Sequence, residues 1–366
     1  MSSDGPNRES IAEIRHKPPT MRDVAALANV SVQTVSAVVN GKPGITGETT
    51  ARVLDVIRHL GYRPDYTARS LRSGRRCTIA LFVSNVANSV LGRMASAAED
   101  YAYANDYNLV LYNTHDDIER EMSYVNTAAQ RSVDGVLFVA ANQPHRGADI
   151  LAAAGIPAVI IDRIPEGYTG PTVGLDNVKA GRLAAEHLLS LGHTRLAHIA
   201  APPGQRLSRE RQTGFVQTVE GSGVVAEVRL EKVPDFGCQH GYDAMQRLLR
   251  RSPIPTGVFA ATDLTAIGAM HAIREAGLSV PHDISVVGLD NIDVAAFQNP
   301  PLTTIRQFLT QLAALGVQML LDILAGNEPT PSQVVLEPAL VVRQSTGPPA
   351  PHAEERGALS ARTRPR

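Results

Sequence analysis

Three aspartates each follow a short apolar run, the position of a side chain at the end of a buried strand. Asp162 ends "AVIID", Asp263 ends "GVFAATD" and Asp290 ends "ISVVGLD". Ligands of parallel sheets bind beyond the carboxyl ends of the strands, so these carboxylates could contact a ligand or imitate a catalytic pair. A carboxylate at this position also often caps the following helix, and that structural interpretation stays open for all three.

The sequence lacks the motifs that would make these carboxylates part of an enzyme. It contains no G-x-G-x-x-G after the first apolar run, no phosphate-binding P-loop and no G-x-S-x-G turn. The two cysteines, Cys77 and Cys238, have neither a disulfide pattern nor the spacing of metal ligands. We therefore expect a protein that is not an enzyme and that needs no cofactor or metal.

A second group of polar residues lies near the amino end, in "SVQTVSAVV", residues 31–39. Ser31 can cap a helix there, with Val35 and Val38 facing inward. Four residues near the start of this helix then face outward: Val32, Gln33, Ser36 and Ala37. Such positions meet base edges when a helix enters the major groove of DNA.

Two further helices would position this one. Thr20 can cap a helix "MRDVAALA", and Thr46 can cap "GETTARVLDVIRHL", which Gly61 ends. Asn29 suits the left-handed turn between the first two helices, and we expect Leu27 on the apolar face of the first. The pattern is that of a helix-turn-helix, although three helices at the start of a larger α/β domain would give the same signals.

The charge distribution favours the first interpretation. Residues 1–76 hold 12 Lys and Arg against 7 Asp and Glu, whereas the whole chain has a net charge of −1. A basic end is where contact with a polyanion is expected. No run reaches the roughly 20 apolar residues of a membrane span, and the polar start does not resemble a signal peptide, so we expect a cytoplasmic protein.

From residue 78 to about 343, β-rich runs alternate with segments of helix length, beginning with "TIALFV", "NLVLYN" and "GVLFVA". This alternation predicts right-handed βαβ units and parallel sheets covered on both faces. The units are too many for one small sheet, so two similar subdomains are expected. Residues 1–19 and 344–366 are polar, irregular or rich in proline, and both are predicted to be disordered tails.

The stretch "TMRDVAALANVSVQTVSAVVNGKPGITGETTARVLDVIRHLGYRPDYTARSLRSG" resembles the DNA-binding headpiece and hinge of the lactose/galactose repressor (LacI/GalR) family of bacterial transcription regulators. The resemblance continues through "VDGVLFVA", "GHTRLAHIA", "ATDLTAIGAM", "ISVVGLDN" and "PPLTTIRQ". It implies an all-α headpiece over residues 20–64, a hinge over 65–76 and a core over 77–343. The core would resemble periplasmic sugar-binding proteins, with two doubly wound α/β subdomains. The expected division gives 77–175 and 306–333 to the first and 176–305 and 334–343 to the second.

The resemblance also implies which residues contact DNA. Gln33 would pair with adenine and Val32 would touch a thymine methyl, while Ala37 replaces the long polar or basic residue that the family usually carries. Leu71 would wedge between base steps in the minor groove. The full set is Thr20, Ser31, Val32, Gln33, Thr34, Ser36, Ala37, Asn40, Tyr62, Ala68, Arg69, Leu71 and Arg72. A solvated linker with incidental charge is the alternative interpretation of residues 65–76.

By the same resemblance, a small-molecule effector binds between the subdomains. Its expected contacts are Asn88, Asp162, Arg211, Phe236, Asp263, Asp290 and Gln307. A sugar is preferred over a purine because the chain has no Trp and few aromatic residues near the expected cleft. For Asp263, a structural role at the start of a helix remains an alternative.

These observations together predict an allosteric regulator, a repressor by preference, that binds double-stranded DNA. After Arg343 the chain has several prolines and one leucine, Leu359, so no leucine heptad follows the core and a homodimer on a pseudo-palindromic operator is expected. The alternatives are a sugar-binding protein without a role in gene regulation and a regulator that responds to a non-sugar ligand such as a nucleobase.

Overall fold

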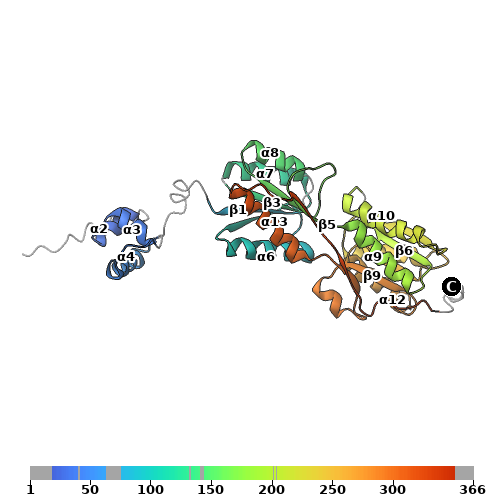
Figure 1. Ribbon diagram of the computed structural model, residues 1–366. Helices are drawn as coiled ribbons and strands as arrows, with labels where there is room; N and C mark the ends of the chain where they lie inside the picture. The colour runs from blue at the N-terminus through green and yellow to red at the C-terminus, as the bar shows by residue number, and fades with distance from the viewer. Residues whose placement is uncertain are drawn as a thin grey trace, which may run out of the picture. The chain divides into compact units, whose positions relative to one another are not determined.

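The structure, a computed structural model, describes residues 19–39, 42–62, 76–131, 133–140, 144–200, 202 and 204–350. The chain divides into two compact units, Met1–Arg76 and Cys77–Arg366 (Figure 1). Within the described ranges no helix is long and apolar enough to cross a membrane. In those ranges, too, no group of His, Cys, Asp or Glu side chains could hold a metal ion.

The first unit contains three helices, α2 (Met21–Leu27), α3 (Val32–Val39) and α4 (Gly47–Leu60). Thr20 and Asp23 form a capping box at the start of α2, where the Thr20 amide donates to Asp23 Oδ2 at 2.6 Å. Asn29, with φ 51°, and Gly61, with φ 62°, adopt the left-handed conformation after α2 and α4. The enclosed core consists of Val24, Ala25, Ala28, Val35, Val53 and Tyr62.

Two side chains of this unit lie where the sequence did not predict them. Leu27 is 60% exposed. The buried face of α2 is made by Val24 with Ala25 and Ala28, and Leu27 lies on the opposite side of Val24 from these two alanines. Tyr62, expected among the DNA contacts, is 7% exposed and packs in the small core. The turn at Gly61 folds the chain back so that the Tyr62 amide donates to Ile57 O at 3.0 Å, and the ring follows the backbone inward.

The first subdomain of the second unit is a six-stranded parallel sheet in the order β11-β5-β4-β3-β1-β2. Its helices α6 and α13 cover one face, and α7 and α8 cover the other (Figure 1). The elements are β1 (Thr78–Val83), α6 (Ser89–Ala104), β2 (Asn108–Asn113), α7 (Ile118–Arg131), β3 (Gly135–Val139), α8 (Pro144–Ala153), β4 (Ala158–Ile161), β5 (Thr172–Leu175), α13 (Leu309–Leu324) and β11 (Gln333–Leu336). The inner strands β1, β3 and β4 read as continuous apolar runs because both faces of the sheet are covered there, whereas the edge strand β2 is partly exposed.

The second subdomain repeats this order as β12-β10-β9-β8-β6-β7, with only β12 antiparallel to its neighbour among the described strands. Helices α9 and α10 pack on one face and α11 and α12 on the other. The elements are α9 (Asn177–Ser190), β6 (Arg195–Ala200), α10 (Arg206–Gly221), β7 (Glu227–Lys232), α11 (Cys238–Leu249), β8 (Gly257–Ala260), α12 (Asp263–Glu275), β9 (Ser285–Asp290), the 3-10 helix η2 (Asp293–Phe297), β10 (Thr303–Arg306) and β12 (Ala339–Val341). The predicted pair of doubly wound subdomains is therefore confirmed.

Between residues 76 and 350, the chain passes from one sheet to the other after β5, after β10 and after β11. The third passage follows Leu336, whereas the sequence placed it after residue 333. The expected boundary was early because residues 333–336 still pair with β5, in a register that sets Gln333 opposite Thr172.

The carboxyl-terminal segment packs against the second subdomain beyond residue 343, where the sequence placed the start of a tail. Ser345 is fully buried, donates to Val286 O at 2.6 Å and accepts from the Thr303 amide at 2.8 Å. The Gly347 amide donates to Ser285 Oγ at 3.0 Å. Residues 344–350 thus belong to the second subdomain rather than to a tail, because small side chains let the backbone pack beside β9 and β10. Residues 1–18 and 351–366, the rest of the two expected tails, lie outside the described residues.

Candidate functional site

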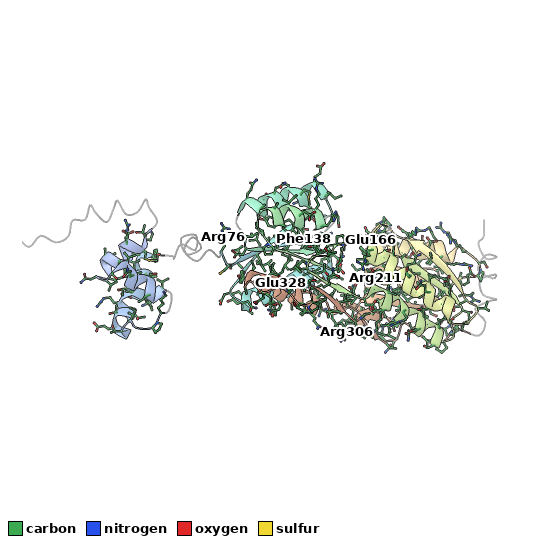
Figure 2. All side chains as sticks on the ribbon, turned by 45° about the horizontal axis from the view of Figure 1, so that its top comes forward. Arg76, Phe138, Glu166, Arg211, Arg306 and Glu328 are labelled. Atoms are coloured by element: carbon green, nitrogen blue, oxygen red, sulfur yellow. The ribbon has the colours of Figure 1, made fainter. Side chains whose placement is uncertain are left out.

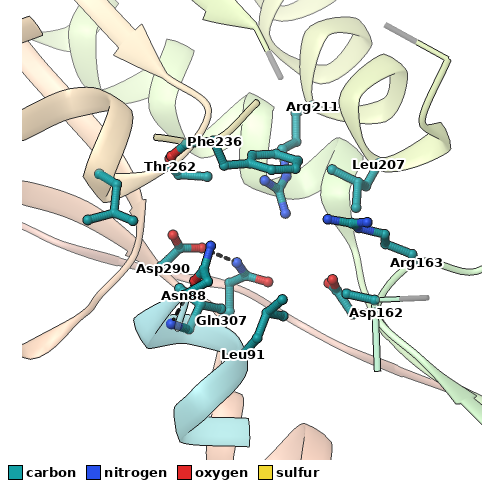
Figure 3. Close-up of a pocket in the computed structure, with 13 residues that line it drawn as sticks. Asn88, Leu91, Asp162, Arg163, Leu207, Arg211, Phe236, Thr262, Asp290 and Gln307 are labelled. Carbon is teal, nitrogen blue, oxygen red and sulfur yellow. Dashed lines mark hydrogen bonds between the residues drawn. The ribbon is translucent and has the colours of Figure 1, made fainter. Parts of the chain in front are cut away.

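A cavity of about 450 Å³ lies between the two subdomains, beyond the carboxyl ends of the strands (Figure 3). The strand order reverses between β1 and β3 in one sheet and between β6 and β8 in the other, which is where α/β sheets bind ligands. The lining residues are Asn88, Val90, Leu91, Ala140, Asp162, Arg163, Leu207, Arg211, Phe236, Thr262, Leu264, Asp290 and Gln307.

Arg211 on α10 supplies a positive charge at this cavity and is only 3% exposed. Its Nε donates to Asn177 Oδ1 at 2.8 Å and its Nη1 donates to Ala261 O at 2.9 Å. Burial lowers the pKa of Arg211, while Asp290 and Asp162 counteract that effect. Since both hydrogen-bond partners are neutral, the charge of the guanidinium, which points into the cavity, stays available to a ligand (Figure 3).

Two glycines allow Arg211 to reach this place. A Cβ on Gly181 of α9 would lie 2.0 Å from Arg211 O, and one on Gly214 of α10 would lie 1.9 Å from Val178 O. The two helices therefore touch through their backbones, and the start of α9 comes beside Arg211.

Asp290 and Gln307 form a buried pair in the cavity wall. Gln307 Nε2 donates to Asp290 Oδ1, and both side chains are 3% exposed. Asp290 Oδ2 and Gln307 Oε1 are buried and have no hydrogen-bond partner among the described residues. Burial, followed by the charge of Asp263, raises the pKa of Asp290 well above its usual value. Unpaired buried acceptors are costly, so the site is suited to a ligand that brings donors.

Asp263, expected among the ligand contacts, does not line the cavity. Its Oδ1 accepts from Thr304 Oγ1 at 2.5 Å and its Oδ2 accepts from the Ile292 amide at 2.9 Å. Burial raises the pKa of Asp263 to about 6 despite these hydrogen bonds. The carboxylate points toward β10 and holds the segment that follows β9. A structural role therefore fits Asp263 better than contact with a ligand.

The first subdomain contributes Asp162 and, directly after it, Arg163. Asp162 is half-buried with φ 74°, and burial raises the pKa of its carboxyl against the opposing charges of Arg211 and Arg163. Arg163 pairs with Asp116 at 3.1 Å, and its guanidinium carbon lies 5.7 Å from the ring centroid of Phe236, across the cavity. One face of Phe236, an expected effector contact, is thus next to a cation.

The remaining expected contact, Asn88, lies at the cavity as the N-cap of α6, where its Oδ1 accepts from the Val90 amide at 2.9 Å. Sequence reasoning missed Arg163, although it directly follows Asp162. It also missed Leu207, which lies four residues before Arg211 on the same side of α10. The sequence contains no pattern that would have marked two further lining residues, Ala140 after β3 and Leu264 near the start of α12.

In the helical unit, α3 presents an exposed polar edge. Ser31 Oγ accepts from the Thr34 amide at 3.1 Å and so caps the helix. Val35 is fully buried, as expected, whereas Val32 is 42% exposed. Of the expected DNA contacts, Thr20, Ser31, Val32 and Gln33 are exposed and Thr34, Ser36 and Ala37 are partly exposed. Asn40, Ala68, Arg69, Leu71 and Arg72, with most of the hinge over 65–76, lie outside the described residues.

Comparison with known protein families matches most of the first unit's helical part and part of the second unit. Residues 20–65 match the family described as "Bacterial regulatory proteins, lacI family". Residues 185–346 match a "Periplasmic binding protein-like domain".

Relatives and solved structures match over nearly their whole length. The HTH-type transcriptional repressor PurR of Pasteurella multocida is 32% identical over 329 residues, which are 89% of this chain and 98% of the relative. The HTH-type transcriptional regulator DegA of Bacillus subtilis is 33% identical over 332 residues, 90% of this chain and 98% of the relative. A lac repressor dimer bound to operator superposes with a TM-score of 0.81 at 28% identity, covering 90% of this chain and all of that one. A transcriptional regulator CelR–cellobiose complex superposes with a TM-score of 0.68 at 31% identity, covering 89% of this chain and 99% of that one.

These relatives are regulators, which confirms that the chain is not an enzyme and excludes a sugar-binding protein without a regulatory role. The resemblance seen in the sequence and the fold expected from it are likewise confirmed. The chain belongs to the lacI family of bacterial regulatory proteins and is a DNA-binding transcriptional regulator.

Proposed function

We propose that the effector of this regulator is a sugar or sugar derivative that binds in the cavity between the subdomains. The observation that carries this proposal is the buried pair of Asp290 and Gln307, with two acceptor atoms that lack donors in the described structure. Arg211 adds donors at the same cavity. Neighbouring hydroxyl groups both donate and accept, so a polyol satisfies both kinds of group at once.

The apolar lining supports the same ligand class. Phe236, Leu91 and Leu207 offer apolar surface for the C–H face of a sugar ring. Similar solved structures include the CelR–cellobiose complex and a LacI-family regulator from Enterococcus faecium with bound ribose, the latter at 29% identity and a TM-score of 0.66.

A binding panel tests the ligand class. Thermal unfolding would be followed with cellobiose, D-ribose, other common sugars and the free nucleobases, and hits would be measured by calorimetry. We expect a sugar to stabilise the native chain, and Asp290→Asn and Gln307→Ala to weaken its binding about tenfold or more, since each removes a hydrogen-bonding group in a buried site. Gln239→Ala, an exposed change on α11, is the matched control. Stabilisation by nucleobases alone would refute the sugar proposal and leave the regulator assignment intact.

For DNA recognition, we propose that α3 reads base edges in the major groove, with Gln33 pairing with adenine and Val32 contacting a thymine methyl. Two copies of the chain would bind together, so that the operator is pseudo-palindromic. Sedimentation is expected to give a dimer, and a stable tetramer would contradict this arrangement. Effector binding would then change operator affinity by about 5- to 150-fold through linkage between the two sites.

Selection from random DNA duplexes tests the reading helix. The native chain should enrich a palindrome at near-physiological salt, where phosphate contacts alone are weak. Ala37→Arg restores a long basic side chain on α3 and should change the preferred base at one position of each half-site, an effect of about 1–3 kcal/mol. An unchanged operator sequence and affinity would show that residue 37 does not read DNA.

A further inference from the structure

Asn177 lies where the chain passes from the first subdomain to the second. It is the first residue of α9, directly after the chain leaves β5 of the first subdomain for the second. Its side chain is polar, yet the residue is only 5% exposed. It is absent from the lining of the 450 Å³ cavity and instead borders a neighbouring cavity of about 560 Å³. Any influence of Asn177 on a ligand in the first cavity must therefore pass through another residue.

The hydrogen bonds of Asn177 identify that residue as Arg211. Asn177 Oδ1 accepts from Arg211 Nε at 2.8 Å, while Nδ2 donates to Leu175 O at 3.2 Å and to Glu210 Oε2 at 3.5 Å. The second bond fixes which end of the amide faces Arg211, because only the NH₂ end can donate to a carbonyl. One amide thus connects the guanidinium of the second subdomain to the last residue of β5 in the first.

Arg211 depends on this contact for its orientation. A guanidinium is a planar fork, so two of its N–H groups held in place define the direction of the rest. Ala261 O holds Nη1 and Asn177 holds Nε, which leaves the far edge of the fork for the cavity. The backbone contact between α9 and α10 at Gly181 and Gly214 keeps the two side chains within this distance.

We propose that Asn177 is a positioning residue of the effector site: it orients Arg211 toward the ligand and connects Arg211 to the first passage between the subdomains. The orienting role rests on geometry alone, whereas the effect on ligand affinity rests on the proposed sugar effector. Glu166 of the first subdomain and Arg211 of the second lie where the two subdomains face each other (Figure 2). A displacement of Leu175 would thus reach Arg211 through the side chain of Asn177.

The first experiment needs no ligand. Nitrogen–proton correlation spectra of the full chain resolve arginine Nε–H groups, and the Arg211 signal is assigned by its loss in Arg211→Lys. We expect this proton to exchange with water at least about tenfold more slowly than that of Arg182, an exposed arginine on α9. Equal exchange rates in the native chain would overturn the proposal without any variant.

Variants then separate orientation from mere packing. Asn177→Ala should speed the exchange of Arg211 Nε–H about tenfold or more, because the acceptor is lost. Asn177→Asp keeps an acceptor for Nε and should preserve the slow signal. Asn105→Ala, at the exposed end of α6, is the control. Slow exchange in a folded Asn177→Ala variant would show that Asn177 does not hold Arg211.

Affinity for cellobiose and D-ribose supplies the functional measurement. Asn177→Ala should weaken binding of whichever sugar binds by about tenfold to a hundredfold, and Asn177→Asp, which keeps the acceptor for Arg211 but loses the donor to Leu175 O, should weaken it clearly less. Equal losses of sugar affinity in both variants would show that Asn177 supports the fold but does not orient Arg211. Should neither sugar bind the native chain, the proposed effector class fails for these sugars, while the exchange rates still decide the role of Asn177.

Discussion

The two subdomains have the same strand order but present their polar groups to the cavity differently. At the second subdomain, Arg211 and Asp290 are each 3% exposed, as is Gln307 at the start of the passage that follows β10, and all three are held by hydrogen bonds to this subdomain or to each other. In the first, Asp162 and Arg163 lie on the loop after β4 and are half-buried. The second subdomain is thus a preformed recognition surface, whereas the groups that the first supplies lie on a loop and are less buried.

The largest expected effect comes from disturbing the helix pair that builds the preformed surface. Gly214→Ala places a Cβ 1.9 Å from Val178 O, so α9 and α10 must move apart. We expect the free energy of unfolding to fall by about 4 kcal/mol, since backbone atoms cannot yield as side chains do. Urea unfolding followed by circular dichroism measures this loss. Gly221→Ala on the same helix meets no atom within 4 Å and should change stability by less than about 1 kcal/mol.

A smaller effect should follow acidification, because His198 is fully buried beneath the same surface. Its ring stacks on Phe259 with 4.7 Å between centroids, and burial lowers the pKa of His198 from 6.5 to about 4. The unfolded chain takes up a proton below pH 6.5 and the folded chain does not until about pH 4. The stabilisation is therefore complete above pH 6.5 and declines by about 3 kcal/mol as pH falls to 4.

Unfolding of the native chain and of His198→Phe at several pH values isolates this contribution. Asp263, with its pKa raised to about 6, gives the opposite trend between pH 3.8 and 6, but this trend is common to both proteins and cancels in their difference. The variant should lose less stability than the native chain over this range. An identical pH dependence would mean that His198 is not held neutral.

The smallest effect is expected at the exposed contacts that join the subdomains. Arg93 pairs with Asp293 at 2.9 Å and Arg209 pairs with Glu166 at 2.8 Å, and all four side chains are at least 45% exposed. Removing either arginine with Ala should change stability by less than about 1 kcal/mol, with the difference shrinking further in high salt. A larger loss in either variant would mean that surface pairs, rather than the buried groups, hold the present arrangement.

The sequence predicted best where a local signal determines the structure. Thr20 and Thr46 cap their helices as expected, and Gly61 ends α4, because the bonds involved lie within a few residues. The doubled α/β core followed from the alternation of apolar runs with longer segments, which depends on pattern rather than on exact neighbours.

The sequence predicted least where a distant residue determines the outcome. Asp162, Asp263 and Asp290 look alike as carboxylates after apolar runs, yet Thr304 and the Ile292 amide turn Asp263 away from the cavity. Arg163 is held at the cavity by Asp116, which follows β2, and by Phe236 of the other subdomain. Such pairings become visible only when the strands are brought side by side.

The three passages between the sheets bear on how the chain is made. Synthesis starts at the amino end, and domains generally fold as units as they emerge. Here the first sheet lacks its edge strand β11 until residue 336 has been made, and the face opposite α7 and α8 lacks α13 until residue 324. Neither half of the core can therefore be finished on the ribosome ahead of the other. A chain cut short near residue 305 would expose the apolar surface that α13 covers, which makes such fragments targets for chaperones and proteases.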